Sequence, residues 1–411
     1  MASIKPFKAI RPTKDKVAFV ASRSYQEYSK KELNAELAFN PFSFLHIINP
    51  GYKFHKKVSG VERFKLVHNR YLEFLEENIL MKDTNESFYL YQIEKGNFNC
   101  CGIFCATSVE DYRNDVIKKH EDTLQQRETL FANYLNTVDF NAEPVLMTYE
   151  DNEAISILLE KQKNNEPDYH FTTKDKITHR LWVVSDSEFI IRLVEEFNKI
   201  TSLYIADGHH RSASSDLLAA ISEKNNATHS GNEPYNHFMS YLIPESEIRI
   251  YEFNRMIKDL NGLSKEHFLI ALDEFYRIEN QGSMLYKPTQ KHHFGMYLDG
   301  EFYSLYLRKK VYSFTDALSE LDTQILFKTI LEPILGIRNL RTDKRIQYGY
   351  GKHNIIQMKD EIDIGNFVVG FSLVPITIEE IKSIADAGLV MPPKSTYIEP
   401  KLRSGITIYE L

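Results

Sequence analysis

The stretch LYIADGHHR, residues 203–211, decides the fold of this chain, because it joins an apolar strand to a helix through a polar turn. Leu203 to Ala206 have the apolar side chains of a buried strand, and the Ser/Ala/Leu-rich run at 211–224 predicts a helix. A strand at 179–184 and a helix at 187–200, which Ser187 can cap, come directly before it. This alternation predicts an α/β (α+β) fold.

The length of the chain predicts more than one domain. Its 411 residues exceed the usual size of a single core, and the composition, 43% hydrophobic and 26% charged, is that of a folded globular protein. The segment GNEPYN at 231–236 is the best candidate break. We therefore expect an N-terminal α/β domain at 1–235 and a C-terminal α/β domain at 236–411.

The charge of the chain limits its partners. A net charge of -7 argues against binding nucleic acid or an anionic membrane through a broad positive field. The first residues have no run that resembles a signal peptide, and no segment is apolar over the length of a membrane span. We expect a cytoplasmic protein with small-molecule partners, no nucleic acid and no membrane, and the sequence does not indicate an oligomeric state.

Further elements follow from periodicity and turn chemistry. We expect strands at 87–94, 100–109, 237–243 and 367–373, a hairpin at 293–307 that turns at Asp299-Gly300, and helices at 112–136, 324–335 and 377–387. Thr377 and Glu380 have the spacing of a capping box. Cys100, Cys101 and Cys105 lie in an apolar strand pattern, which favours core residues over a metal site because no partner pair has zinc spacing.

Three clusters have residues that can carry chemistry. Asp207 to Arg211 combine an acid, a glycine and three basic side chains at the start of a helix, where anions bind, and Asp207 can bind Mg²⁺ or orient a histidine. The pair His120-Glu121, followed by Thr123, offers a carboxylate that can accept a proton, although it can equally face solvent from a helix. Met391 to Thr396, with Lys401 and Arg403 beyond, can surround a phosphate or form a basic loop without a role.

The standard nucleotide-binding signatures do not occur in the sequence. There is no GxxxxGK[ST] loop, no protein-kinase HRD or DFG set and no GxGxxG after a strand. The glycine-containing run at 349–352 lacks the required spacing and is interpreted as a loop or strand end.

Together, the three clusters resemble the free L-serine kinases, which are related to the ParB partition proteins and the sulfiredoxins. The family has an HE pair in a helix, a strand ending in DGHHR and a late glycine-to-PK[ST]T segment, matched here by His120-Glu121, by 205–211 and by 388–396. Longer relatives, including a branch that uses diphosphate, are similar over most of the chain, with features like NPFSFLHI at 40–47 and MPPKSTYIEPKL at 391–402. Departures occur at Ser212 and at 23–27.

The resemblance implies a ParB/sulfiredoxin-like mixed-sheet core, with the active site in the cleft between the two domains, and a kinase that makes O-phospho-L-serine for serine or cysteine metabolism. It implies Mg²⁺ as cofactor and diphosphate as donor, with ADP or ATP as alternatives. Roles follow from the matched positions. The implied catalytic residues are Glu121 as general base, Asp207 and His209; the donor site is His120, Gly208, His210, Arg211, Lys394, Ser395 and Thr396; the substrate site is Thr123, Lys401 and Arg403; and the metal ligand is Asp207.

Two other classes of protein fit parts of the pattern. A sulfiredoxin-like reductase would need a cysteine in the turn that here holds Gly208 and His209, which excludes that reading. A ParB-like nucleotide-binding or regulatory protein without kinase activity stays an alternative, although the sequence has no evident helix-turn-helix module or basic surface.

Overall fold

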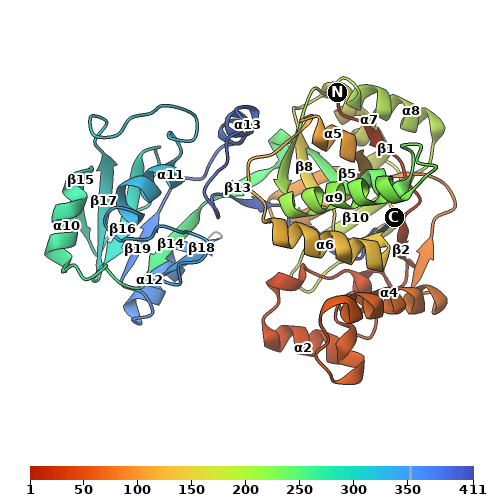
Figure 1. Cartoon of the computed structure of the whole chain (residues 1–411), viewed down its shortest axis with the longest axis horizontal. Helices are drawn as coiled ribbons and strands as arrows, with labels where there is room; N and C mark the ends of the chain where they lie inside the picture. Colours follow the sequence, from red (N-terminus) through yellow and green to blue (C-terminus); the bar gives the residue numbers. More distant parts are fainter. Residues whose placement is uncertain (351–353) are drawn as a thin grey trace. The chain divides into compact units, whose positions relative to one another are not determined.

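The structure, a computed structural model, describes residues 1–350 and 354–411 and confirms the α/β fold class (Figure 1). The chain forms two compact units. The first comprises residues 1–119, 123–248 and 400–411, and the second comprises residues 120–122 and 249–399. Among the described residues, no helix has both the length and the apolar character needed to cross a membrane.

The first unit is built on a mixed nine-stranded sheet with the order β6-β11-β8-β12-β5-β4-β10-β9, in which β1 also pairs with β5. The pairs β6/β11 and β8/β12 are parallel and the others are antiparallel. The strands are β1 (Ile4–Lys5), β4 (Phe88–Lys95), β5 (Phe98–Ser108), β6 (Ile117–Lys118), β8 (Val145–Tyr149), β9 (Tyr169–Thr172), β10 (Thr178–Val184), β11 (Leu203–Asp207) and β12 (His237–Pro244). The strands expected at 87–94, 100–109, 179–184 and 237–243 are thus confirmed.

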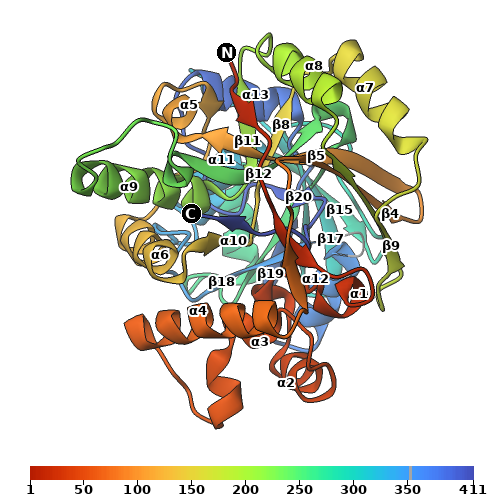
Figure 2. The ribbon, with the colours of Figure 1, turned by 90° about the vertical axis from the view of Figure 1, so that its right-hand side faces the viewer.

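Helices pack on this sheet in pairs (Figures 1 and 2). Helix α6 (Gln125–Val138) lies beside α9 (His209–Asn225), and Ala132, Leu135 and Leu218 form their shared cluster. Helices α7 (Glu153–Lys163) and α8 (Ser187–Phe197) lie together and bury apolar side chains in the core of the sheet. Helix α8 is capped by Asp186, whose carboxylate accepts a hydrogen bond from the Phe189 amide at 2.8 Å, so the cap expected at Ser187 was one residue late.

The long helix expected at 112–136 is wrong. Helix α5 (Val109–Arg113) ends near the start of this segment, and Asp115 has a positive φ of 58°. Ile117 then belongs to β6, where it pairs with Leu203 of β11. The segment predicted as one helix therefore contains the end of α5, strand β6 and helix α6. His120 and Glu121 consequently lie on the loop between β6 and α6, not within a helix.

The three cysteines are core residues, as predicted. Cys100, Cys101 and Cys105 are free thiols on β5 and are at most 5% exposed. Burial raises the pKa of the Cys101 thiol to about 12, and it raises the pKa of the other two thiols as well. These thiols are therefore neutral and unreactive in the folded protein.

A smaller apolar cluster joins the two ends of the chain within the first unit. It contains Phe44 of the NPFSFLHI stretch, α4 (Gly60–Glu76) and Ile408 near the C-terminus. The C-terminal segment runs beside the N-terminal one, because Ser22 and Ser404 exchange backbone hydrogen bonds of 3.1 and 2.9 Å. Gly405 allows this approach, since a Cβ on it would lie 2.7 Å from the Phe44 ring.

The described part of the second unit contains a six-stranded antiparallel sheet with the order β15-β17-β16-β19-β14-β18. The hairpin β16–β17 turns at Asp299 and Gly300, whose φ values of 52° and 79° suit a tight hairpin, as predicted. The strands are β14 (Phe253–Ile257), β15 (Tyr276–Gly282), β16 (His293–Leu298), β17 (Glu301–Leu307), β18 (Ile346–Tyr350) and β19 (Val369–Ser372). Residues 351–352 of the predicted loop lie outside the described residues.

The helices of the second unit differ in how well local signals predicted them. Helix α13 (Ile378–Asp386) begins at the predicted capping box, with Thr377 as its N-cap and Glu380 in its first turn. The helix expected at 324–335 instead begins two residues earlier as α11 (Asp322–Leu326) and continues as a π-helical turn, Phe327–Leu331. The other helices are α10 (Lys265–Asp273) and α12 (Asn354–Asp363).

The compact units divide the chain at other points than the predicted domains. The first unit continues to Ile248, because β12 pairs with β5 and β8 in the first sheet. A boundary between residues 235 and 236 would separate β12 from both partners. The last twelve residues also return to the first unit, which brings Lys401 and Arg403 to the sheet that carries Asp207.

Candidate functional site

The polar turn forms where β11 ends and α9 begins. The register of β11 shifts between Ile205 and Asp207, which is a β-bulge, and such bulges redirect a side chain at the end of a strand. Gly208 has a φ of 112° and occupies the cap position of α9, so the chain can reverse into the helix. Ser212, Ser214 and Ser215 are buried in the first turns of α9, and their small side chains let the helix pack closely. Asp207 thus lies beside the first amides of a helix, where anions are stabilised.

Arg211 and Lys401 neutralise Asp207. The Arg211 guanidinium donates to Asp207 Oδ2 at 2.6 Å and to the Pro144 carbonyl at 2.6 Å, while Lys401 Nζ lies 3.6 Å from Asp207 Oδ1. Burial raises the pKa of Asp207, but the charges of Arg211 and Lys401 outweigh it and leave the pKa below its ordinary value. The carboxylate is therefore ionised at neutral pH, and its side chain is still 46% exposed.

His209 does not add positive charge to the turn. Its side chain is 5% exposed, and burial lowers its pKa to about 3 despite the nearby carboxylate of Asp207. The neutral ring can donate one N–H and accept at its other nitrogen. Of the three basic side chains expected to supply cations to a phosphate, His209 is thus a neutral hydrogen-bonding group at physiological pH.

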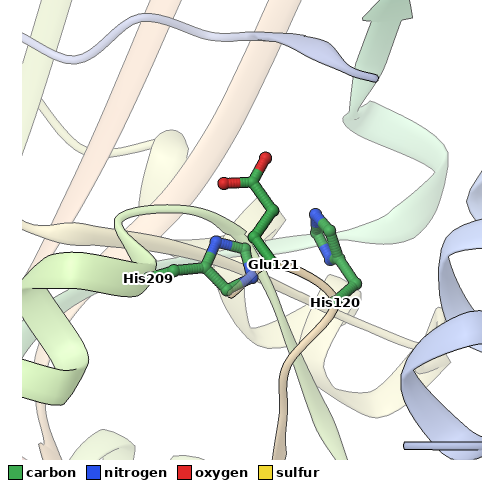
Figure 3. A group of neighbouring side chains, drawn as sticks. All are labelled: His120, Glu121 and His209. Atoms are coloured by element: carbon green, nitrogen blue, oxygen red, sulfur yellow. The ribbon is translucent and has the colours of Figure 1, made fainter. Parts of the chain in front are cut away.

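His120 and Glu121 lie close to His209 (Figure 3). One ligand atom from each of His120, Glu121 and His209 lies within 4.8 Å of the other two. Figure 3 shows His209 at the start of its helix and the other two on a loop. The predicted proton acceptor and the predicted catalytic histidine are therefore neighbours.

The hydroxyl of Thr123, predicted to bind substrate, is already engaged. It donates to the carboxylate of Glu128, in the first turn of α6. Thr123 therefore ties the His120-Glu121 loop to the helix that follows it.

A pocket of the first unit has Asp207 and Arg211 in its wall. Its volume is about 420 Å³ including the part that is open to solvent. The lining residues come from four segments: Ser24, Glu27, Glu143, Pro144, Leu146, Asp207, Arg211, Pro400, Lys401, Leu402, Arg403 and Ser404. Three carboxylates and three cations thus face one hollow. Arg403 is 7% exposed and pairs with Asp175 at 2.5 Å, so it contributes its charge from within the wall.

The Met391–Thr396 loop lies in the second unit, and its parts have different environments. Lys394 is exposed and has a positive φ of 59°, and the buried Arg255 guanidinium donates to the Lys394 carbonyl at 3.2 Å. Ser395 is only 2% exposed, its hydroxyl donates to the Pro392 carbonyl at 2.6 Å, and the same oxygen lies 3.1 Å from the Thr323 hydroxyl, from which it can accept. Ser395 therefore maintains the shape of the loop, whereas Lys394 and the partly exposed Thr396 are available to a ligand.

This loop contacts the HE segment within the second unit. The Met391 amide donates to the His120 carbonyl at 2.9 Å. The backbone of His120 is thus fixed by the start of the loop.

The oxygen ligands of the pocket fit Mg²⁺. Asp207 offers a partly exposed carboxylate, and Mg²⁺ prefers oxygen ligands, commonly one or two carboxylates completed by substrate phosphates. The group of His120, Glu121 and His209 is a different donor set, because two ring nitrogens suit zinc and other transition metals better than Mg²⁺. Asp207 is thus the better candidate for a magnesium ion that arrives with phosphate.

Sequence reasoning missed three charged residues near these features. Glu27 and Glu143 line the pocket, and Arg255 supports the Lys394 loop. Glu27 is the last residue of the 23–27 departure from the family pattern, but no role was predicted for it. No sequence pattern indicated Arg255, because its contact with the Lys394 carbonyl joins residues that are far apart in the sequence.

A family model described as a protein of unknown function, DUF1015, matches residues 4–324, and no curated protein matches the chain significantly. Three solved structures are each 12% identical over 74% of this chain: a free serine kinase mutant in complex with AMP (91% of its own chain, TM-score 0.38), C-terminally truncated SbnI from Staphylococcus aureus (85%, 0.39) and a conserved hypothetical protein from Pyrococcus furiosus (94%, 0.31). TM-scores below 0.5 do not establish a shared fold, so the functional argument rests on the chain's own residues.

Proposed function

The chain belongs to the DUF1015 family, and we propose that it is a phosphotransferase that makes O-phospho-L-serine from free L-serine. The observation that carries this proposal is the pocket at the start of α9, where the ionised Asp207 pairs with Arg211 and Lys401. Cations and helix amides around one carboxylate suit a phosphoryl group with its metal ion. The three motifs occur in the same order as in the free L-serine kinases, and this resemblance indicates L-serine as the acceptor of the phosphoryl group.

In the proposed reaction, Glu121 accepts the proton of the serine hydroxyl as its oxygen attacks the terminal phosphorus of the donor. The new bond joins the serine oxygen to phosphorus, and the bond from phosphorus to the bridging oxygen of the donor breaks. With diphosphate, the leaving group is inorganic phosphate. A positioned carboxylate typically contributes about 10²–10⁴-fold to such a proton transfer.

The surrounding residues hold the transferring group. Arg211 and Lys401 offset its negative charge, and the neutral His209 can donate a hydrogen bond to a phosphoryl oxygen without adding charge. In this proposal, His210 and the backbone amides that follow Gly208 donate further hydrogen bonds to the phosphoryl oxygens. When bound, Mg²⁺ would be held by Asp207 and donor oxygens and would offset charge on the donor phosphates.

We propose diphosphate as the donor, with Lys394 and Thr396 as further phosphate ligands and Ser395 as support. The sequence has no recognisable adenine or ribose motif, and the longer diphosphate-using relatives resemble the chain over most of its length. ADP and ATP are the alternative donors. The product would feed serine or cysteine metabolism.

The test is to incubate the purified protein with L-serine, Mg²⁺ and one of diphosphate, ADP or ATP, and to measure phosphoserine by mass spectrometry. We expect product with diphosphate. Phosphoserine formed only with ADP or ATP would show that the donor is a nucleotide, and the proposed reaction would stand. No phosphoserine with any donor would refute the kinase activity and favour a binding or regulatory role.

The matched variants are Glu121→Gln and Asp122→Asn, which remove neighbouring charges from the loop between β6 and α6, where Glu121 is partly buried and Asp122 is exposed. Glu121→Gln is expected to lower the rate at least about a hundredfold, and Asp122→Asn to leave it within about twofold. Equal rates for the two variants would contradict the role of Glu121 as the general base.

A further inference from the structure

Two carboxylates in the pocket of the first unit have no task in phosphoryl transfer. Glu27 ends the short 3₁₀ helix η1 (Tyr25–Glu27), and Glu143 precedes β8. Asp207 can hold a metal ion, but further carboxylates repel the oxygens of a phosphate. A pocket that bound only a polyanion would not be expected to keep them. Their presence indicates that the ligand also carries a positive group.

Glu27 is a carboxylate without a donor. It is partly buried, and burial raises its pKa above the ordinary value although Lys401, Arg403 and Arg23 oppose that shift. Within residues 1–350 and 354–411, no group donates a hydrogen bond to it, because Lys401 faces Asp207 and Arg403 pairs with Asp175. A partly desolvated carboxylate in this state gains most from a charged donor supplied by a ligand.

The backbone holds Glu27 beside the C-terminal cations. The Ser22–Ser404 hydrogen bonds join the segment before η1 to the segment that carries Lys401 and Arg403. On the same side, Glu143 Oε1 accepts a hydrogen bond from the Ser404 hydroxyl at 3.3 Å, which fixes its carboxylate in the wall. The pocket wall near Ser404 therefore carries both acidic and basic groups, and a zwitterion can complement both.

We propose that Glu27 binds the α-ammonium group of the substrate, with Glu143 as a second acceptor, so that the pocket selects alcohols that carry an amino-acid head group. In this arrangement the substrate carboxylate faces Arg403 in the pocket wall, while Arg211 and Lys401 face the phosphoryl group. This inference rests on the proposed function, and it assigns the acceptor's ammonium group to specific residues.

The kinetic experiment compares L-serine with 3-hydroxypropanoate, which has the same hydroxyl and carboxylate but no amine. For Glu27→Gln, we expect the KM for L-serine to rise at least about tenfold, with the KM for diphosphate and the kinetics of 3-hydroxypropanoate unchanged. Glu27→Asp should recover part of the loss. Glu62→Gln, which changes an exposed carboxylate in the first turn of α4 in the same unit, is the matched control and should behave as wild type. An equal effect on both acceptors, or a fall in kcat with unchanged KM, would overturn the proposal.

A binding experiment separates this inference from the proposed reaction. Calorimetric titration of the protein with L-serine, without a donor, should show binding that Glu27→Gln weakens at least about tenfold at an unchanged unfolding temperature. If wild type does not bind L-serine, or if Glu27→Gln binds it equally well, the ammonium site is refuted. Glu27-dependent binding without any phosphoserine formation would instead refute the kinase and leave the amino-acid site standing.

Discussion

Replacing Gly208 by alanine should lower the rate of phosphoserine formation. It should lower the free energy of unfolding little more than Gly231→Ala does. A Cβ on Gly208 would lie 2.9 Å from Arg211 Nε and 3.0 Å from Nη2, and the φ of 112° disfavours any side chain. The positive φ costs roughly 1–2 kcal/mol. The guanidinium can move at small cost, and its partly exposed ion pair with Asp207 contributes about 0.2–1 kcal/mol. We expect the first unit to lose about 1–3 kcal/mol.

Gly231→Ala is the matched control, because Gly231 has a φ of 85° and no atom within 4 Å of an added Cβ. Calorimetric unfolding should show a similar loss for both variants. Phosphoserine formation should fall about a hundredfold for Gly208→Ala alone, since misplacing a charged group by about 1 Å can cost that much. Without Arg211, the pKa of Asp207 should rise, so the acidic limb of the pH–rate profile should move to higher pH. Equal activity and equal pH profiles for the two variants would show that the position of Arg211 beside Asp207 does not depend on Gly208 or does not matter for the reaction.

Three further predictions concern stability and accessibility. Burial lowers the pKa of His179 to about 3 and that of His237 to about 4, so as the pH falls below about 6.5 these histidines are protonated in the unfolded chain before they are protonated in the folded protein. The urea concentration at the unfolding midpoint should therefore decline from pH 7 to pH 5. His179→Gln should make this decline with pH smaller. The three buried thiols should not react with a thiol reagent in the native protein at pH 8 but should all react in denaturant, and rapid native labelling would contradict their burial. Ser395→Ala should cost about 1 kcal/mol and raise the KM for the donor, whereas Thr396→Ala should raise that KM without the stability loss.

Local signals predicted the centre of the site well. An apolar strand, a glycine and the start of a helix follow one another within nine residues at 203–211, so short-range chemistry specifies the turn. The capping box at Thr377 and the hairpin at Asp299-Gly300 are equally local and were found correctly. Each depends on contacts between residues that are close in sequence, which periodicity and turn propensities describe.

The errors and omissions involve partners far apart in sequence. The segment at Ile117 became a strand because it pairs with Leu203, and apolar spacing cannot distinguish that pairing from a helix face. Glu27 entered the pocket because Ser22 pairs with Ser404 near the other end of the chain. The loss of charge on His209 has the same origin, since burial by the folded unit lowers its pKa. Propensity describes none of these contacts.

The central claim is that one phosphoryl group passes from donor to the serine hydroxyl. Phosphorus NMR of the wild-type protein with diphosphate, Mg²⁺ and L-serine measures this directly, because it follows donor and products in one sample. We expect phosphoserine and inorganic phosphate to appear in equal amounts as diphosphate disappears, and no reaction to occur without serine. Unchanged diphosphate, or two phosphates released per diphosphate with no phosphoserine, would contradict the claim.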